Sequence, residues 1–147
     1  MNIIFTGTQK GITHLQHQML KKTLQEINTK NEDVVLLHGD CIGADAAAGE
    51  ICEELNIPVH IYNIVNKRAY SKYNNYVHHE MPPLERNRLM VDFGSALIAC
   101  PGEKKEILRS GTWTTIRYAR RVNKPIIYIW PDGTREVVES VVQATGL

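Results

Sequence analysis

The sequence has few cysteines, and none of them has the spacing of a metal site. Cys41, Cys52 and Cys100 are odd in number and form no CxxC pair, which favours neither a disulfide framework nor a zinc site. A free cysteine is usually packed as a small apolar side chain. We therefore expect no metal ion in this protein.

The sequence also has no long apolar run and no excess of charge of one sign. No stretch approaches the roughly 20 apolar residues of a membrane-spanning helix, and the N-terminus lacks the basic start of a signal peptide. The formal net charge of +1 offers no general attraction to polyanions. We expect a cytoplasmic protein with no membrane partner. A nucleic-acid partner would need a local basic patch, for which residues 104–121 are the only candidate, so we expect none.

Length and composition indicate one globular domain. The chain has 147 residues, of which 43% are hydrophobic and 22% are charged, as in ordinary soluble proteins. A chain of this length can bury about two-thirds of its unfolded surface in one core. We expect a single domain over residues 1–147.

Short apolar runs alternate along the chain with segments of helical periodicity. The runs predict strands at residues 2–5, 34–37, 58–62, 96–100 and 126–130. Apolar residues on one face predict a helix capped by Thr13, helices over 44–55 and 84–91, and a helix that contains 116–120. Such alternation is typical of a parallel sheet covered on both faces. We predict an α/β, Rossmann-like fold with a mostly parallel sheet of about five strands and helices on both faces.

Two segments leave alternatives open. Residues 63–83 show little periodicity, and a loop of this length in a compact domain is often functional. Its Tyr70, Tyr73 and Tyr76 would form either a lid over a ligand or a subunit contact. The tail from residue 134 fits either a helix, by the spacing of its valines, or a hairpin turned by residues 131–133.

The junction after the fourth predicted strand has the pattern of an anion site. A loop over residues 101–109 leads through Ser110, Gly111 and Thr112 into a helix. Unpaired backbone N–H groups and the helix dipole favour an anion at such a helix start. We expect these residues, with the nearby Arg109 or Arg117, to bind a phosphate, the alternative being an ordinary helix capped by Ser110. Trp113 would either stack on a base or pack in the core.

The loop after the second predicted strand combines glycines with carboxylates. Gly39 and Gly43 permit close approach of the backbone, whereas Asp40 and Asp45 would repel a bare phosphate. Carboxylates suit donor-rich groups such as ribose hydroxyls or an exocyclic amine. We expect the sugar or base of a nucleotide to bind here, and for Asp45 the alternative is a helix cap. The candidate ligand-binding residues of this loop are Gly39, Asp40, Gly43, Ala44 and Asp45.

The loop after the first predicted strand would form a third wall of the same site. It contains Gly7, Thr8 and Gln9, and the loops that follow parallel strands meet at one edge of the sheet. The alternative for these residues is a plain turn.

Three segments recur in a recognisable order. They read HGDCIGAD at 38–45, ERNRLM at 85–90 and SGTW at 110–113. Their order and spacing resemble the SLOG superfamily of Rossmann-like proteins, especially its cpYpsA-related branch. In that branch a Gly-x-x-x-Gly-Ala-Asp turn, an Arg-Asn-x-x-Met helix and a Ser-x-Gly-Thr-like turn recur. The resemblance implies that Arg86 and Asn87 contact a ligand and that the protein forms a homodimer or a larger homo-oligomer.

The chain is more distantly similar to the Lonely Guy phosphoribohydrolases. Their Glu-Arg-Lys-x-x-Met element resembles residues 85–90 and implies a catalytic role for Arg86. Thr115 stands where their Pro-Gly-Gly-x-Gly-Thr-x-x-Glu element has its catalytic glutamate. This departure favours binding over hydrolysis.

The loops and the resemblance predict a protein that binds a nucleotide or a nucleotide-derived signalling molecule, such as an ADP-ribose-like or cyclic nucleotide. Such a protein would sense or sequester its ligand and would need no cofactor. The alternative is a nucleotide N-glycosidase, in which Arg86 stabilises the departing charge and Asp40 or Asp45 assists at the ribose. A third hypothesis, DNA handling, draws on a distant likeness to DNA-processing protein A, and the near-neutral charge argues against it.

Overall fold

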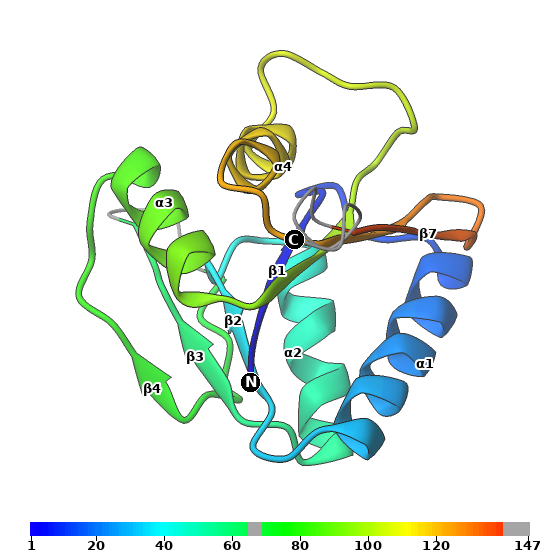
Figure 1. Ribbon diagram of the computed structural model, residues 1–147. Helices are drawn as coiled ribbons and strands as arrows, with labels where there is room; N and C mark the ends of the chain where they lie inside the picture. Colours follow the sequence, from blue (N-terminus) through cyan, green and yellow to red (C-terminus); the bar gives the residue numbers. More distant parts are fainter. Residues whose placement is uncertain (65–68, 140–147) are drawn as a thin grey trace.

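The computed structural model describes residues 1–64 and 69–139, which form one mixed sheet and four helices (Figure 1). The strands lie in the order β4-β3-β2-β1-β5-β6-β7, and all neighbours are parallel except β6 and β7. The predicted α/β, Rossmann-like class with a mostly parallel sheet is confirmed. The strands are β1 (Asn2–Gly7), β2 (Val35–His38), β3 (Val59–Ile61), β4 (Tyr76–Val77), β5 (Ala96–Cys100), β6 (Ile126–Ile129) and β7 (Arg135–Val138).

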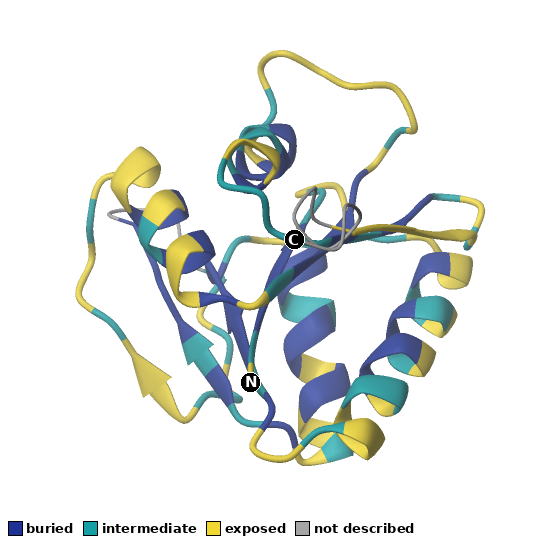
Figure 2. Ribbon diagram, in the orientation of Figure 1, coloured by how far each residue is buried: buried dark blue, intermediate teal, exposed yellow. Residues whose placement is uncertain are grey.

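The two faces of the sheet are covered by different pairs of helices. Successive strand residues point to opposite faces, so Ile3 and Phe5 of β1 pack with α1 and α2, whereas Ile4 packs with α3 and α4. Figure 2 shows the buried side of α1 and α2 turned toward the strands. No helix among the described residues is long and apolar enough to cross a membrane. The helices are α1 (His14–Lys30), α2 (Ala44–Leu55), α3 (Pro83–Phe93) and α4 (Gly111–Arg121).

The predicted cap of α1 is confirmed, and it also connects distant loops. Thr13 Oγ1 accepts a hydrogen bond from Gln16 N–H at 3.0 Å, and Gln16 Oε1 accepts one from Thr13 N–H at 2.9 Å, which is a capping box. The buried Gln16 amide also donates to Pro101 O at 2.8 Å and to Ile129 O at 3.0 Å. The start of α1 therefore holds the loop that follows β5.

The sheet has two strands more than the expected five. β4 lies within the segment 63–83 and pairs with β3, where Asn75 N–H donates to Val59 O and His78 N–H donates to Ile61 O, both at 2.8 Å. A two-residue exposed strand is too short to show an alternating pattern, which is why the sequence indicated a loop.

The described part of the tail is a hairpin and not a helix. β7 runs antiparallel to β6, and Gly133 in the turn has φ +83°, a conformation that glycine adopts readily. Val137 and Val138 are exposed on this edge strand. The spacing of valines that would fit a helix in this tail also included Val141 and Val142, which lie outside the described residues.

Two buried glycines give stability predictions of opposite sign. A Cβ at Gly94 would overlap the buried Ile4 side chain, so Gly94→Ala should lower the free energy of unfolding by about 1–3 kcal/mol. A Cβ at Gly49 of α2 would meet His38 Nε2 at 3.6 Å, an ordinary contact. Gly49→Ala should raise the free energy of unfolding by up to about 1 kcal/mol, because alanine favours a helix interior. Urea denaturation measures both, and a similar effect of the two substitutions would contradict this packing.

Candidate functional site

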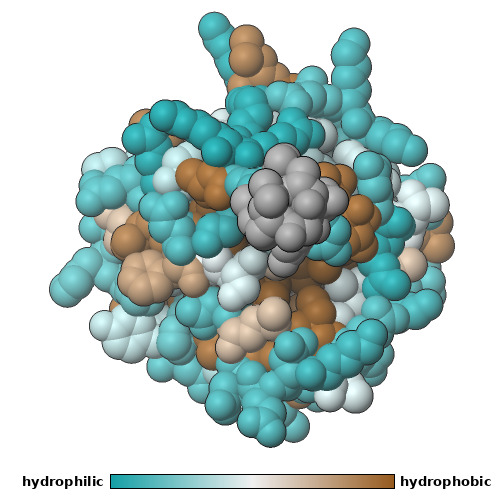
Figure 3. Space-filling model, viewed as in Figure 1, coloured by the Kyte–Doolittle hydropathy of each residue, from teal (hydrophilic) through white to brown (hydrophobic). Residues whose placement is uncertain are grey.

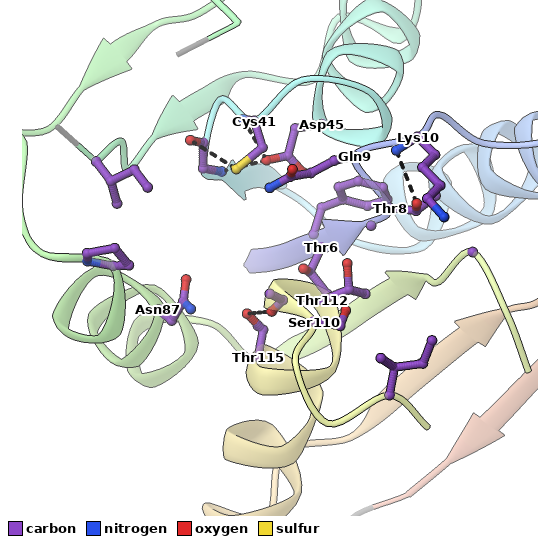
Figure 4. Close-up of a pocket in the computed structure, with 18 of the residues that line it drawn as sticks. Thr6, Thr8, Gln9, Lys10, Cys41, Asp45, Asn87, Ser110, Thr112 and Thr115 are labelled. Atoms are coloured by element: carbon purple, nitrogen blue, oxygen red, sulfur yellow. Dashed lines mark hydrogen bonds between the residues drawn. The ribbon is translucent and has the colours of Figure 1, made fainter. Parts of the chain in front are cut away.

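A cavity of about 530 Å³ opens at the carboxyl edge of the sheet. It lies beside β1 and β5, where the strand order reverses, and ligands of such sheets bind at that point. The loops after β1, β2 and β5 and parts of α3 and α4 line it (Figure 4). The predicted residues that line the cavity are Gly7, Thr8, Gln9, Gly39, Asp45, Arg86, Asn87, Ser110, Gly111 and Thr112.

The N-terminus of α4 presents unused hydrogen-bond donors on one wall. Ser110 is the N-cap, and its Oγ accepts a hydrogen bond from Trp113 N–H at 3.3 Å. The N–H groups of Gly111 and Thr112 and the Thr112 hydroxyl make no hydrogen bond to any described residue. The two alternatives for this helix start are therefore compatible, because the cap satisfies one N–H group and leaves three donors at the cavity.

Trp113 packs in the core and does not line the cavity. Its side chain is 1% exposed and stacks on Trp130, with ring centroids 6.3 Å apart. Its indole N–H donates to Glu103 Oε1 at 2.9 Å. Of the two interpretations of Trp113, packing is the one that the structure shows, because the ring fills the space beneath α4 instead of reaching a ligand.

Asp45 lies across the cavity from the start of α4. Figure 4 shows Asp45 and Gln9 on one side and Ser110, Thr112 and Thr115 on the other. The buried Asp45 Oδ2 accepts hydrogen bonds from Gly39 N–H at 3.2 Å and Cys41 N–H at 3.0 Å. Asp45 therefore orders the loop after β2 and does not cap α2. Burial raises the pKa of its carboxyl group, since a charged carboxylate loses hydration there.

Three predicted residues support the cavity without lining it: Asp40, Gly43 and Ala44. Asp40 has φ +56°, and its Oδ1 accepts a hydrogen bond from Ser71 N–H at 3.0 Å. Its buried side chain thus orders the segment after residue 68, and the ribose contact and catalytic assistance of Asp40 stay predictions. Ala44 N–H donates to Thr8 O at 3.1 Å, which joins two walls of the cavity.

Arg86 lines the cavity and is also a structural residue. Its Nη1 donates to Gly39 O at 3.1 Å and to Tyr62 O at 2.9 Å, and its Nε donates to Asn87 Oδ1 at 2.7 Å. These bonds tie α3 to the ends of β2 and β3. The Asn87 side-chain amide makes no further hydrogen bond to a described residue, so its N–H groups are available on this wall.

The sequence reasoning missed four polar residues of the lining: Thr6, Lys10, Cys41 and Glu103. Each lies at or just beyond the carboxyl end of β1, β2 or β5, and this position was the only signal that could have indicated them. Burial raises the pKa of the Cys41 thiol to about 11, so this thiol stays protonated and is a poor nucleophile.

The tyrosines of the long loop do not line the cavity. Tyr73 donates to Ile57 O at 2.9 Å, Tyr76 packs edge-on against His78, and Tyr70 is exposed. Tyr73 and Tyr76 therefore belong to the β4 edge of the sheet, and among the described residues of this segment it is Ile64 and Pro83 that line the cavity. Nowhere in residues 1–64 and 69–139 do three His, Cys, Asp or Glu side chains gather as a metal would require.

Neither a family model nor a curated protein sequence matches the chain. Solved structures do match. DNA processing protein A from Helicobacter pylori has a TM-score of 0.66 at 19% identity over 99% of this chain and 73% of that one. The molybdenum cofactor binding protein from Rippkaea orientalis has a TM-score of 0.64 at 19% identity over 88% and 76%. The protein TM1055 has a TM-score of 0.62 at 12% identity over 85% of this chain and 71% of that one.

The chain shares its fold with these solved structures. The resemblance of the three sequence segments to the SLOG superfamily is consistent with these neighbours. The structural similarity establishes the fold, but at sequence identities below 20% it does not identify the ligand.

The buried His38 gives a prediction on pH and stability. Its Nδ1 accepts a hydrogen bond from Asp40 N–H at 2.9 Å, and its Nε2 has no partner among the described residues. Burial lowers the pKa of His38 from the ordinary 6.5. The unfolded chain therefore binds this proton more readily, so His38 supports stability above about pH 6.5, and this contribution is lost as the pH falls toward the lowered pKa.

His38→Asn keeps an acceptor near the Nδ1 position and removes this titration. Between about pH 7.5 and about pH 5.5, the free energy of unfolding should fall less in the variant than in the wild type. Urea denaturation at both pH values measures the difference. Asp45, whose raised pKa acts in the opposite sense, is present in both proteins. Equal pH dependence would show that His38 is not the titrating group.

Proposed function

We propose that the protein binds a nucleotide or a nucleotide-derived signalling molecule, such as an ADP-ribose-like or cyclic nucleotide, as a sensor or sequestering protein. One observation supports this above all. The free donors at the start of α4 face a cavity whose opposite wall holds the Asp45 carboxylate. A ligand with an anionic group at one end and hydrogen-bond donors at the other fits both walls.

The phosphate of this ligand would bind at Gly111 and Thr112. Lys10 and Arg109 also line the cavity, and neither forms an ion pair with a described residue. Their charges would attract an anion to the entrance. The sugar or base would lie toward Gln9 and Asp45, where the side-chain amide and the carboxylate offer both donors and acceptors.

Binding without turnover is favoured because the cavity lacks an activated group at the position that hydrolysis would use. Thr115 donates its hydroxyl to Gly111 O at 3.1 Å, so an uncharged, internally bonded side chain stands in place of a glutamate. The Arg86 guanidinium is engaged with two carbonyl oxygens.

The homo-oligomer implied by the sequence resemblance stays a prediction, which light scattering of the purified protein would test.

The Thr112 hydroxyl provides the sharpest test of the phosphate position. Thr112→Val keeps the shape of the side chain and removes the donor. Affinity for nucleoside 5′-monophosphates and ADP-ribose should fall about tenfold or more, as expected for a hydrogen bond to a charged group. Affinity for the matching nucleosides, which lack the phosphate, should change little. Isothermal titration calorimetry measures both.

Thr114→Val is the matched control for this experiment. Thr114 belongs to the same helix turn, but its hydroxyl donates to Ser110 O at 2.8 Å and it does not line the cavity. Its substitution should leave both affinities unchanged. If no nucleotide, ADP-ribose derivative or cyclic dinucleotide binds the wild type more tightly than millimolar, the proposed function is wrong. Native mass spectrometry of protein purified from cells would identify a retained ligand directly.

The alternative function, cleavage of an N-glycosidic bond, predicts release of a free base from nucleoside monophosphates. We expect chromatography to show no more base from the wild type than from Arg86→Ala. Circular dichroism must first show that this variant is folded, because Arg86 holds the carbonyl groups of Gly39 and Tyr62. Base release by the wild type that the folded variant lacks would favour the enzyme.

Single-stranded DNA, which DNA processing protein A from Helicobacter pylori binds, is not the ligand that we propose. The formal net charge here is +1, and the cavity carries the carboxylates of Asp45 and Glu103 as well as its cationic residues. A general single-strand site combines a continuous basic groove with aromatic faces for the bases. The two tryptophans are instead stacked in or against the core.

A further inference from the structure

We infer that Glu103 is a specificity-determining residue, whose carboxylate accepts hydrogen bonds from the ribose hydroxyls of the ligand and so selects ribonucleotides over deoxyribonucleotides. This inference rests on the proposed function and adds to it the class of sugar. The observation behind it is the position of the Glu103 carboxylate, which lines the cavity and is held by a hydrogen bond from Trp113 in the core.

The position of Glu103 is set by the chain on both sides. The preceding Gly102 passes so close to Thr8 that a Cβ on it would lie 3.1 Å from Thr8 Oγ1. Pro101 O accepts a hydrogen bond from the buried Gln16 at 2.8 Å. The backbone therefore reaches Glu103 directly from the end of β5 and brings it to the cavity wall that Thr8 also forms.

The direction of the Glu103 side chain is set by Trp113. The indole N–H donates to Glu103 Oε1 at 2.9 Å, and the ring that carries it is 1% exposed and stacked on Trp130. A donor fixed in the core leaves the carboxylate little rotational freedom. Glu103 Oε2 makes no hydrogen bond to any described residue, so a ligand can use it.

The rest of the loop over 101–110 is held against α4 as well. Glu106 accepts hydrogen bonds from Arg117 at 3.1 Å and from Arg120 at 2.8 Å, and Arg117 also donates to Leu108 O at 2.9 Å. Each exposed ion pair contributes little by itself, but several attachments on one helix restrict the loop. Figure 3 shows hydrophobic and hydrophilic residues protruding together at the top of the molecule, the region that this loop reaches in Figure 1. The tip, with Leu108 at 81% exposure, projects away from the core.

The charge of Glu103 indicates what it recognises. Its hydrogen-bond donor, Trp113, belongs to the first turn of α4, and Glu103 lines the same cavity as Gly111 and Thr112. A carboxylate is disfavoured as a direct neighbour of phosphate oxygens, whereas it stabilises a hydrogen-bond donor of the ligand. In a nucleotide the donors next to the phosphate are the ribose hydroxyls. Asp45 accepts two N–H groups at its Oδ2, whereas Glu103 accepts one at its Oε1, so Glu103 adds a second acceptor to the one that Asp45 offers across the cavity.

Calorimetry with AMP, 2′-deoxy-AMP and 3′-deoxy-AMP tests the inference on the intact protein. The wild type should bind AMP about tenfold or more tightly than at least one of the deoxy analogues, as expected for loss of a hydrogen bond to a charged group. Glu103→Gln should remove most of this discrimination. The Trp113 N–H will hold the amide oxygen of the glutamine, so the variant presents an NH₂ donor where the wild type presents an acceptor.

Glu106→Gln is the control, because Glu106 lies on the same loop, carries the same charge and does not line the cavity, and the side-chain oxygen of the glutamine can still accept a hydrogen bond from Arg117 or Arg120. It should keep the wild-type discrimination. Trp113→Phe keeps an aromatic ring in the core and removes the indole N–H together with part of the ring, so circular dichroism must first show that the variant is folded. It should reduce the discrimination between ribose and deoxyribose without changing the preference for AMP over adenosine, because Trp113 is a positioning residue for Glu103 and not for the phosphate.

The outcomes separate this inference from the proposed function. If the wild type binds AMP and its deoxy analogues equally, or if Glu103→Gln retains the discrimination, Glu103 does not read the ribose, although nucleotide binding stands. If neither AMP nor any other nucleotide binds the wild type, the proposed function fails, and the inference about Glu103 fails with it.

Discussion

The close approach of α2 to the loop after β1 is the constraint on which the cavity depends. Ala44 N–H donates to Thr8 O at 3.1 Å. The preceding Gly43 has φ +92°, and a Cβ there would lie 2.6 Å from Gln9 O. A larger residue at position 43 would separate the two loops and with them the wall on which Gln9 and Asp45 lie side by side. The close approach of two backbones therefore requires a glycine at this position.

Buried charges of opposite sign hold the loop after β2 from two sides. Asp45 accepts hydrogen bonds from the N–H groups of Gly39 and Cys41, and Arg86 donates to the Gly39 carbonyl. Each charge is thus stabilised by backbone dipoles, as a buried charge requires. Because these hydrogen bonds hold the Arg86 guanidinium in place, it fixes the shape of the cavity. It is less able to reorient toward a charge that develops during a reaction. The same bonds that order the site therefore favour binding over catalysis.

Much of the fold could be predicted because buried parallel strands leave a strong signal. The run at 96–100 is apolar throughout, since helices cover both of its faces, whereas β4 and β7 are exposed edge strands with no such pattern. At the site, parallel topology determines which loops meet, but not which side chains enter the cavity. That depends on local backbone angles and packing. Asp40 has a backbone conformation in the left-handed region and accepts a hydrogen bond from Ser71 N–H. Trp113 is buried in the core.

The first turn of α4 connects the core to the anion donors and to Glu103 on one wall of the candidate site. Successive helix residues point about 100° apart, so Thr112 faces the cavity while Trp113 enters the core and holds Glu103 from within. One rigid turn therefore sets the separation between the donors for an anion and the acceptor beside them. A ligand whose own groups have that separation can make both contacts without ordering a loop first, and the entropy that such ordering costs is saved. Selectivity for the ligand would then come from the helix and the core beneath it, and not from the length or composition of the exposed loop.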